Sequence, residues 1–355
     1  MKKSFLAALV ATLSLFVFIL PIAACAKKHE AKTEWECNSE KHRHACTVCA
    51  EEVFDEGAHN FKTVDGVKKC EICGFERAFT DDEAYSLWRV GIAAALSYEG
   101  DYTLTYKRKE TDGNGKLLLD RDCRQARSAS NDFYSYNYDY EDYDNSGTLK
   151  ESTREIVLAS AADTTGILYN YHIKYYDETD EKFVEKNEEK TITQADLDEE
   201  AYMSPKGLCG ENYFNLSAAT TETTFDDFKK AYDKWIETLE EESMTVSLSV
   251  EVKSDGSVIL YRETSYNYKD GDVTSEKYLY TTAVEKVGII VKDGIFVGFT
   301  EIDTLIDVYI VTDGQNIDIH TDGGNAAKKI RSEEGLMSYS FDKAKFDELS
   351  KDYLK

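Results

Sequence analysis

Proline is nearly absent from this sequence, with only Pro21 and Pro205 among 355 residues. So little proline excludes a proline-rich spacer of the kind that extends through a cell wall. Basic residues are also few, because 42 Lys and Arg stand against 68 Asp and Glu and give a formal net charge of −26. That charge repels phosphate backbones, and we therefore expect no nucleic-acid partner.

Catalytic motifs are missing as well. The sequence contains no P-loop, no G-x-S-x-G, no H-E-x-x-H and no dinucleotide-binding fingerprint. Cys209 lies in a glycine-flanked segment, where it could act as a nucleophile with His172 or His320 as its base. Nothing in the sequence brings either histidine near that cysteine, so we expect that the protein is not an enzyme.

One apolar run, residues 5–22, is long enough to draw attention, and it follows Lys2 and Lys3. A basic start, an apolar run and then small residues are the parts of a secretory signal. The run ends in Ile-Ala-Ala-Cys at Cys25, which resembles the lipobox of bacterial lipoproteins. An ordinary signal, or an uncleaved anchor helix with a chance cysteine, is the alternative.

The lipobox resemblance implies a signal peptide at 1–24, cleavage before Cys25 and a diacylglycerol on the Cys25 sulfur. Residues 25–34 are polar and would form a short tether. The mature chain would then be anchored to a membrane by its N-terminal lipid. It would face the extracytoplasmic side, either at the cell surface or at the periplasmic face.

Five of the eight cysteines crowd into residues 35–79, namely Cys37, Cys46, Cys49, Cys70 and Cys73. Four of them form two C-x-x-C knuckles, and two such turns supply the soft ligands of tetrahedral Zn²⁺. We therefore predict a small zinc-ribbon-like module with one structural zinc. The predicted ligands are Cys46, Cys49, Cys70 and Cys73, with His44, His59 and Cys37 as further candidates.

Oxidised cysteines are the competing interpretation, because the predicted compartment permits disulfides. A redox-active C-x-x-C is a third, although no βαβ pattern surrounds these cysteines. Outside the cluster, Cys123 and Cys209 either form a disulfide with each other or are buried thiols.

Residues of about 35–77 also resemble a short Cys/His repeat of bacterial surface proteins. That repeat reads His-x-His-x-Cys-x-x-Cys, then a central His, then Cys-x-x-Cys-Gly with an aromatic residue. The matching residues are His42, His44, Cys46, Cys49, His59, Cys70, Cys73, Gly74 and Phe75. The resemblance implies metal binding rather than an activity. The chain departs from it at Arg43, where Trp is common, and in the extra thiol of Cys37.

Residues 80–355 predict an α+β fold, with antiparallel meander sheets and helices packed on one face. The sequence Thr-Asp-Asp-Glu from Thr80 has the pattern of a capping box and predicts a helix at about 81–98. Apolar periodicity predicts further helices at about 225–241 and 341–354. Alternating strands with Asp-Gly turns fill the stretches between them.

Two stretches, 80–203 and 224–355, share one order of acidic cap, aromatic helix, alternating strand, Asp-Gly turn and return strand. A duplicated unit explains this order, and so does the general similarity of proteins rich in hairpins. Trp88 and Trp235 occupy matching positions. Each is predicted to anchor a filled core against the strands that follow its helix.

Two functions are compatible with these features. The first is a non-enzymatic surface interaction or scaffold module that contains structural zinc and binds another protein. The order of helix and meander also faintly resembles LolA-like lipoprotein carriers, which implies a cavity for a hydrophobic ligand or lipid. A carrier needs a large apolar cavity, whereas an interaction module has a filled core.

Overall fold

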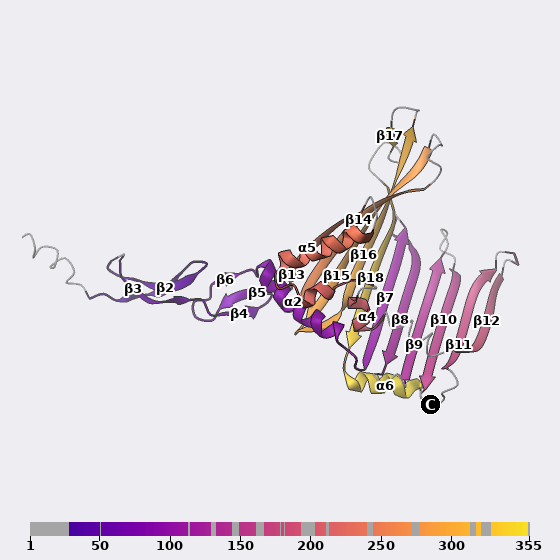
Figure 1. Ribbon diagram of the computed structural model, residues 1–355, viewed down its shortest axis with the longest axis horizontal. Coiled ribbons are helices and arrows are strands. Elements are labelled where there is room, and N and C mark those ends of the chain that lie inside the picture. The colour runs from indigo at the N-terminus through magenta and orange to yellow at the C-terminus, as the bar shows by residue number, and fades with distance from the viewer. Residues whose placement is uncertain are drawn as a thin grey trace, which may run out of the picture. The chain divides into compact units, whose positions relative to one another are not determined.

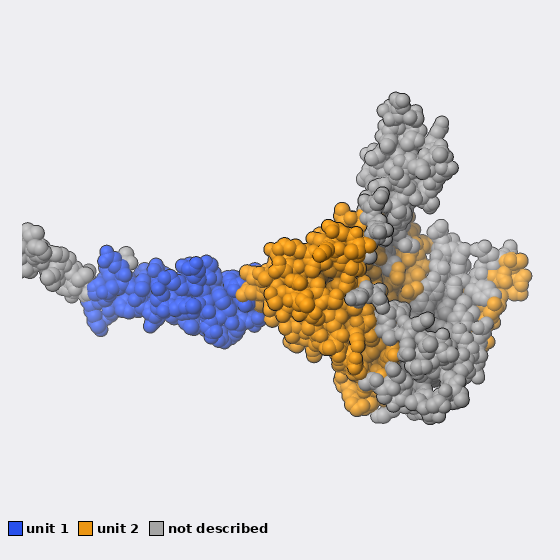
Figure 2. Space-filling model, viewed as in Figure 1, with its two compact units in different colours: residues 1–78 blue, residues 79–355 orange. Residues whose placement is uncertain are grey.

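The computed structural model divides the chain into two compact units, Met1–Ala78 (unit 1) and Phe79–Lys355 (unit 2), which Figure 2 colours separately. The predicted signal peptide and Cys25 lie outside the described residues. The backbone is described for residues 28–49, 51–112, 114–128, 133–143, 149–160, 167–177, 179–180, 182–192, 203–210, 213–239, 244–270, 277–312, 317–320 and 328–353.

Unit 1 contains two antiparallel sheets of three strands, with the orders β1-β2-β3 and β4-β5-β6 (Figure 1). The bounds are Ala31–Cys37 for β1, Lys41–Cys46 for β2, Val53–Ala58 for β3, Phe61–Val64 for β4, Val67–Cys70 for β5 and Glu76–Arg77 for β6. A tight turn at Asp65 and Gly66, both with positive φ, joins β4 to β5. Each C-x-x-C knuckle begins at the last residue of a strand, β2 or β5.

Unit 2 is built on one antiparallel sheet of twelve strands. Its order is β12-β11-β10-β9-β8-β7-β18-β16-β15-β14-β13, and β17 pairs with β16 off this path. The bounds are β7 Tyr102–Asp112, β8 Leu117–Arg127, β9 Phe133–Tyr143, β10 Leu149–Ser160, β11 Ile167–Asp177, β12 Lys182–Ile192, β13 Thr245–Val252, β14 Val258–Asp270, β15 Lys277–Lys292, β16 Ile295–Thr312, β17 Ile317–His320 and β18 Lys328–Ser340.

The two stretches that look alike in the sequence form the two halves of this single sheet. Strands β7 to β12 make one meander, and β13 to β16 make the other. β18 joins them, because Met337 pairs with Phe299 of β16 on one side and with Tyr106 of β7 on the other.

The helices of unit 2 are α2 Asp81–Leu96, α4 Pro205–Cys209, α5 Phe225–Ile236 and α6 Lys343–Tyr353, with 3-10 turns η3 Ser217–Thr220 and η4 Glu237–Leu239. α2 begins with the predicted capping box. The backbone N–H of Glu83 donates to Thr80 Oγ1, and the N–H of Thr80 donates to the Glu83 carboxylate. A mainly antiparallel sheet with few helices agrees with the α+β class. Within the described part of the chain, no helix has both the length and the apolar character to span a membrane.

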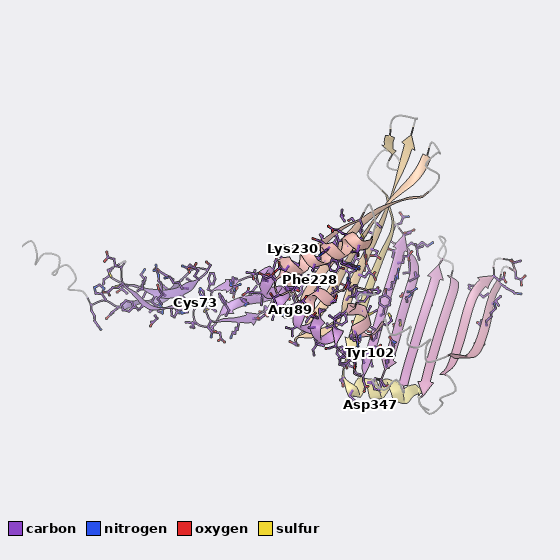
Figure 3. The ribbon with its side chains drawn as sticks, in the orientation of Figure 1. Cys73, Arg89, Tyr102, Phe228, Lys230 and Asp347 are labelled. Carbon is purple, nitrogen blue, oxygen red and sulfur yellow. The ribbon has the colours of Figure 1, made fainter. Side chains whose placement is uncertain are left out.

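α2 and α5 share one core. Phe228 lies on α5 (Figure 3). The rings of Tyr85 and Trp88 on α2 lie 5.2 and 5.8 Å from its ring. Trp88 is fully buried, and α2 packs against β13 to β16. Trp235 is only partly buried at the edge of the same core. The two tryptophans are therefore not equivalent anchors, which corrects the expectation from their matching positions.

Candidate metal centres

Two groups of side chains in unit 1 bring possible metal donors together. Site A consists of His29, Cys46, Cys49 and Glu52, and site B consists of His42, His59, Cys70 and Cys73. In each group, one donor atom from every residue lies within 4.8 Å of the others.

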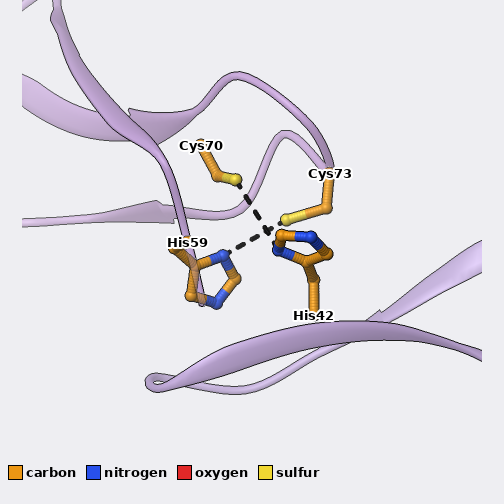
Figure 4. Close-up of side chains that lie close together, drawn as sticks. All are labelled: His42, His59, Cys70 and Cys73. Atoms are coloured by element: carbon orange, nitrogen blue, oxygen red, sulfur yellow. Dashed lines mark hydrogen bonds between the residues drawn. The ribbon is translucent and has the colours of Figure 1, made fainter. Parts of the chain in front are cut away.

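Site B takes its ligands from both sheets of unit 1. His42 lies on β2, His59 precedes β4, and Cys70 ends β5. The Nδ1 atom of His42 is 4.0 Å from the Cys70 sulfur, and the Nδ1 atom of His59 is 3.4 Å from the Cys73 sulfur (Figure 4). Tetrahedral zinc, with bonds of about 2.3 Å to sulfur and about 2.0–2.1 Å to nitrogen, places these atoms about 3.6 Å apart. The two separations lie on either side of that value, so the group could hold a metal ion.

The backbone orients the His59 imidazole toward the thiols. Its Nε2 atom is 2.7 Å from the carbonyl oxygen of Asn38. Because a carbonyl only accepts, Nε2 carries a proton, and Nδ1 is the ring nitrogen that faces the thiols. Metal-binding histidines usually have such a partner on the second nitrogen. Phe75 stacks on the ring at 4.8 Å and restricts its rotation.

A glycine shapes the turn that carries the two thiols of site B. Gly74 has φ of +74°, and its N–H donates to the Cys70 carbonyl oxygen at 3.0 Å. The N–H of Cys70 in turn donates to the carbonyl oxygen of Phe75 at 2.8 Å. Glycine adopts this φ without a steric penalty, so the sequence Cys-x-x-Cys-Gly suits the turn.

The same turn acts on the thiol pKa values. Burial raises the pKa of Cys70. Hydrogen bonds from the Cys73 backbone, the His59 side chain and the Ile72 backbone lower this pKa by more than burial raises it, so that it falls to about 6. Burial raises the pKa of Cys73 to about 11, and its contacts with the Cys37 and Cys70 thiols add to the rise. One sulfur therefore ionises readily beside one that keeps its proton. A bound cation would favour the thiolate form of both.

Site A is centred on one imidazole nitrogen. The Nδ1 atom of His29 lies 3.3 Å from the Cys46 sulfur, 3.2 Å from the Cys49 sulfur and 2.8 Å from Glu52 Oε2. Burial raises the pKa of Cys46, but hydrogen bonds from the backbone of Val48 and Cys49 lower it to about 7. The site thus offers one nitrogen, two sulfurs and one carboxylate.

The structure places the two C-x-x-C pairs in separate groups, each completed by histidine. Cys46 and Cys49 belong to site A, and Cys70 and Cys73 belong to site B. This differs from the predicted set of four thiolates around one zinc.

The further candidates have different positions. His59 is part of site B. Cys37 is exposed and contacts Cys73, outside the four-residue group. His44 lies in neither group. Its ring lies 3.7 Å from the ring of Trp35 in a tilted arrangement, and its Nδ1 is 3.1 Å from the carbonyl oxygen of Glu34.

Sequence reasoning did not single out His29, His42 or Glu52 as ligands. His29 lies within residues 25–34, whose polar composition predicts a tether and not a metal site. His42 belongs to the Cys/His repeat, which is the one signal in the sequence for its place in site B. Glu52 has no signal in the sequence, because acidic residues are common in this chain.

In unit 2, Cys123 and Cys209 are both buried free thiols within the hydrophobic core. Of the two predicted alternatives, buried thiols describe the structure. Burial raises the pKa of Cys209 far above its ordinary range, so this cysteine lacks the thiolate character of a nucleophile.

Unit 2 also has an acidic group, formed by Glu285, Glu301 and Asp303 on β15 and β16. Arg262 of β14 donates to Glu285 Oε1 at 2.7 Å in a half-buried ion pair. The Arg262 guanidinium thus already neutralises part of this acidic group, and we assign no metal ion to the group.

Comparison with known proteins identifies no family: no protein-family model matches the chain, and neither does any curated protein sequence. Within the part of the chain that the structure describes, the Cys/His groups indicate a possible metal-binding function.

Proposed function

We propose that this chain is a lipid-anchored, extracytoplasmic, non-enzymatic interaction protein whose unit 1 is stabilised by zinc in site B. The signal pattern that ends at Cys25 supports the anchor. The N₂S₂ donor set of His42, His59, Cys70 and Cys73 supports the zinc. A protein partner is the proposed ligand of unit 2.

One observation supports a structural role for the proposed metal ion. Among the described residues of unit 1, the buried ones are His42, Cys46 and Cys70. All three belong to site A or site B. The places where other small domains bury apolar side chains are here occupied by metal donors.

A unit of this size with so little apolar burial needs another source of folding free energy. Metal binding supplies it, because the ligands are brought together only in the folded chain. Structural zinc sites in small peptides contribute about 10–16 kcal/mol of apparent binding free energy near neutral pH. That is far more than the few exposed ion pairs of unit 1 provide.

The core of unit 2 supports an interaction function over a carrier function. The large side chains of Trp88, Phe214, Phe228, Phe296 and Phe299 fill the space between helices and sheet, each at most 1% exposed. A carrier of apolar ligands needs that space to be empty.

A hollow on the sheet of unit 2 offers a possible contact surface for such a partner. Lys107, Lys109 and Glu334 line it together with the half-exposed Ile302 and Leu336. Apolar side chains with charged side chains around them are similar to the apolar core and polar rim of a protein interface.

The zinc can be tested on the full chain purified in detergent from bacterial membranes. Metal analysis should find an ion that the wild type and the Cys46→Ser/Cys49→Ser variant retain and that Cys70→Ser/Cys73→Ser loses. Loss of that ion should also make unit 1 sensitive to limited proteolysis. A wild-type protein without zinc, whose intact mass shows disulfides among these cysteines, would contradict the proposal.

A further inference from the structure

We infer that unit 1 consists of two copies of one metal-binding element, and that site A holds a second zinc ion, which exchanges with solvent faster than the ion in site B. The inference rests on the proposed zinc-binding function and extends it to His29, Cys46, Cys49 and Glu52.

Strand pairing shows the repetition first. In the first sheet, Ala31 of β1 pairs with Cys46, the first cysteine of its knuckle. In the second sheet, Phe61 of β4 pairs with Cys70, the first cysteine of the other knuckle. In both copies a histidine stands two residues before the paired residue, at His29 and at His59.

Backbone hydrogen bonds repeat in the same way. The residue after the first cysteine donates its N–H to the carbonyl oxygen of the residue after the histidine. This bond joins Thr47 to Glu30 in the first copy and Glu71 to Asn60 in the second, at 2.9 Å in each. Such agreement in bonds that no side chain dictates indicates the same local fold.

A similar backbone hydrogen bond closes the end of each C-x-x-C knuckle. The N–H of Cys46 donates to the carbonyl oxygen of Glu52 at 3.2 Å, and that of Cys70 donates to the carbonyl oxygen of Phe75 at 2.8 Å. Each copy therefore reads as histidine, hairpin, C-x-x-C turn and a third strand, β3 or β6.

The repeated backbone places the histidines identically. His29 and His59 both turn Nδ1 toward their knuckle, with nitrogen–sulfur distances of 3.2–3.3 Å in site A and 3.4 Å in site B. All are close to the separation of about 3.6 Å expected around tetrahedral zinc. If site B holds zinc through this arrangement, site A presents the same three donors to a second ion.

The copies differ in the fourth ligand. Site B is completed by His42, which is 3% exposed and comes from β2 of the first copy. Site A is completed by Glu52 of its own copy, whose side chain is 54% exposed, and the His29 side chain is 22% exposed. Water and chelators can therefore reach an ion in site A, whereas site B is more enclosed.

The test is zinc stoichiometry by native mass spectrometry of the detergent-solubilised full chain, combined with zinc release to a coloured chelator. The wild type should carry two ions, and release should show a fast phase and a slow phase. His29→Ala should lose one ion and the fast phase while keeping the slow phase. His44→Ala, which removes a nearby histidine outside both sites, should keep both.

Each measured ratio of zinc to protein leads to a different conclusion. One ion in the wild type that His29→Ala keeps and Cys70→Ser loses overturns the second site but leaves the proposed function standing. No ion overturns both. One ion lost in Cys46→Ser and in Cys70→Ser alike restores the four-thiolate arrangement. Two ions released in a single phase contradict the difference in exchange.

Cobalt substitution gives a check that does not depend on release. Thiolate-to-cobalt charge-transfer absorption scales with the number of coordinated sulfurs, and each site should contribute two. His29→Ala should reduce this absorption, and Glu52→Gln should alter the band shape with a smaller loss. Unchanged spectra in both variants would contradict site A.

Discussion

The indole Nε1 of Trp88 donates a hydrogen bond to the carbonyl oxygen of Ile289 at 2.9 Å, across 201 residues of sequence. Trp88 lies on the first helix of unit 2, and Ile289 lies on β15 in the middle of the second meander. The one polar atom of the indole ring therefore has its hydrogen-bond partner in the far half of the chain.

Replacement of Trp88 by alanine should lower the free energy of unfolding of unit 2 by about 3–5 kcal/mol, as for other large core aromatics. Trp235→Ala is the matched control and should cost less, because Trp235 is only partly buried. Urea denaturation followed by far-ultraviolet circular dichroism compares the two. Equal losses would contradict the difference in burial.

The same pair of variants bears on the carrier alternative. If Trp88→Ala keeps its unfolding midpoint but loses a lipid that co-purifies with the wild type, Trp88 lines a pocket. A LolA-like carrier would then replace the interaction module.

Gly298→Ala should prevent stable folding of unit 2. Gly298 has φ of +137°, and a Cβ there would lie 1.9 Å from the carbonyl oxygen of Met337 on β18. Neither the backbone angle nor the neighbouring strand can accommodate it.

Gly115→Ala is the control for this glycine. Gly115 also has a positive φ, of +82°, but it faces open space at the β7–β8 turn. Its replacement should cost about 1–2 kcal/mol through backbone strain alone. Thermal unfolding of both variants distinguishes close strand contact from φ strain, and similar melting temperatures would refute the steric argument.

Cys25→Ala should release the protein from the membrane fraction or leave it mislocalised. Acyl chains contribute about 0.8 kcal/mol of membrane affinity per buried CH₂ group, and the variant cannot receive them. Incorporation of labelled fatty acid measures this directly. Equal labelling of wild type and variant would show that Cys25 is not the site of lipidation.

Features with local causes could be predicted from the sequence. The capping box at Thr80 and Glu83 forms within one helical turn, so its residues suffice to identify it. Asp255 and Gly256 likewise form the predicted turn between β13 and β14, where Asp255 Oδ1 accepts the N–H and the hydroxyl of Ser257.

Features that depend on partners distant in the sequence could not be predicted from it. The two C-x-x-C pairs look like one zinc site in the sequence, because spacing does not show that Cys46 lies beside His29 and Cys70 beside His42. The shared core of α2 and α5 was also missed. Apolar periodicity gives the buried face of a helix but not the strand that covers it.

The position of β18 between the two meanders also affects the order in which the sheet can form. Thr103 of β7 and Ser340 of β18 are hydrogen-bonded neighbours that are 237 residues apart in the sequence. During synthesis, the edge of β7 is made long before the strand that covers it. Ordering so long an intervening segment slows the closing step. An uncovered strand edge can meanwhile pair with another chain. The edge of β7 therefore stays open to such pairing until β18 has been synthesised.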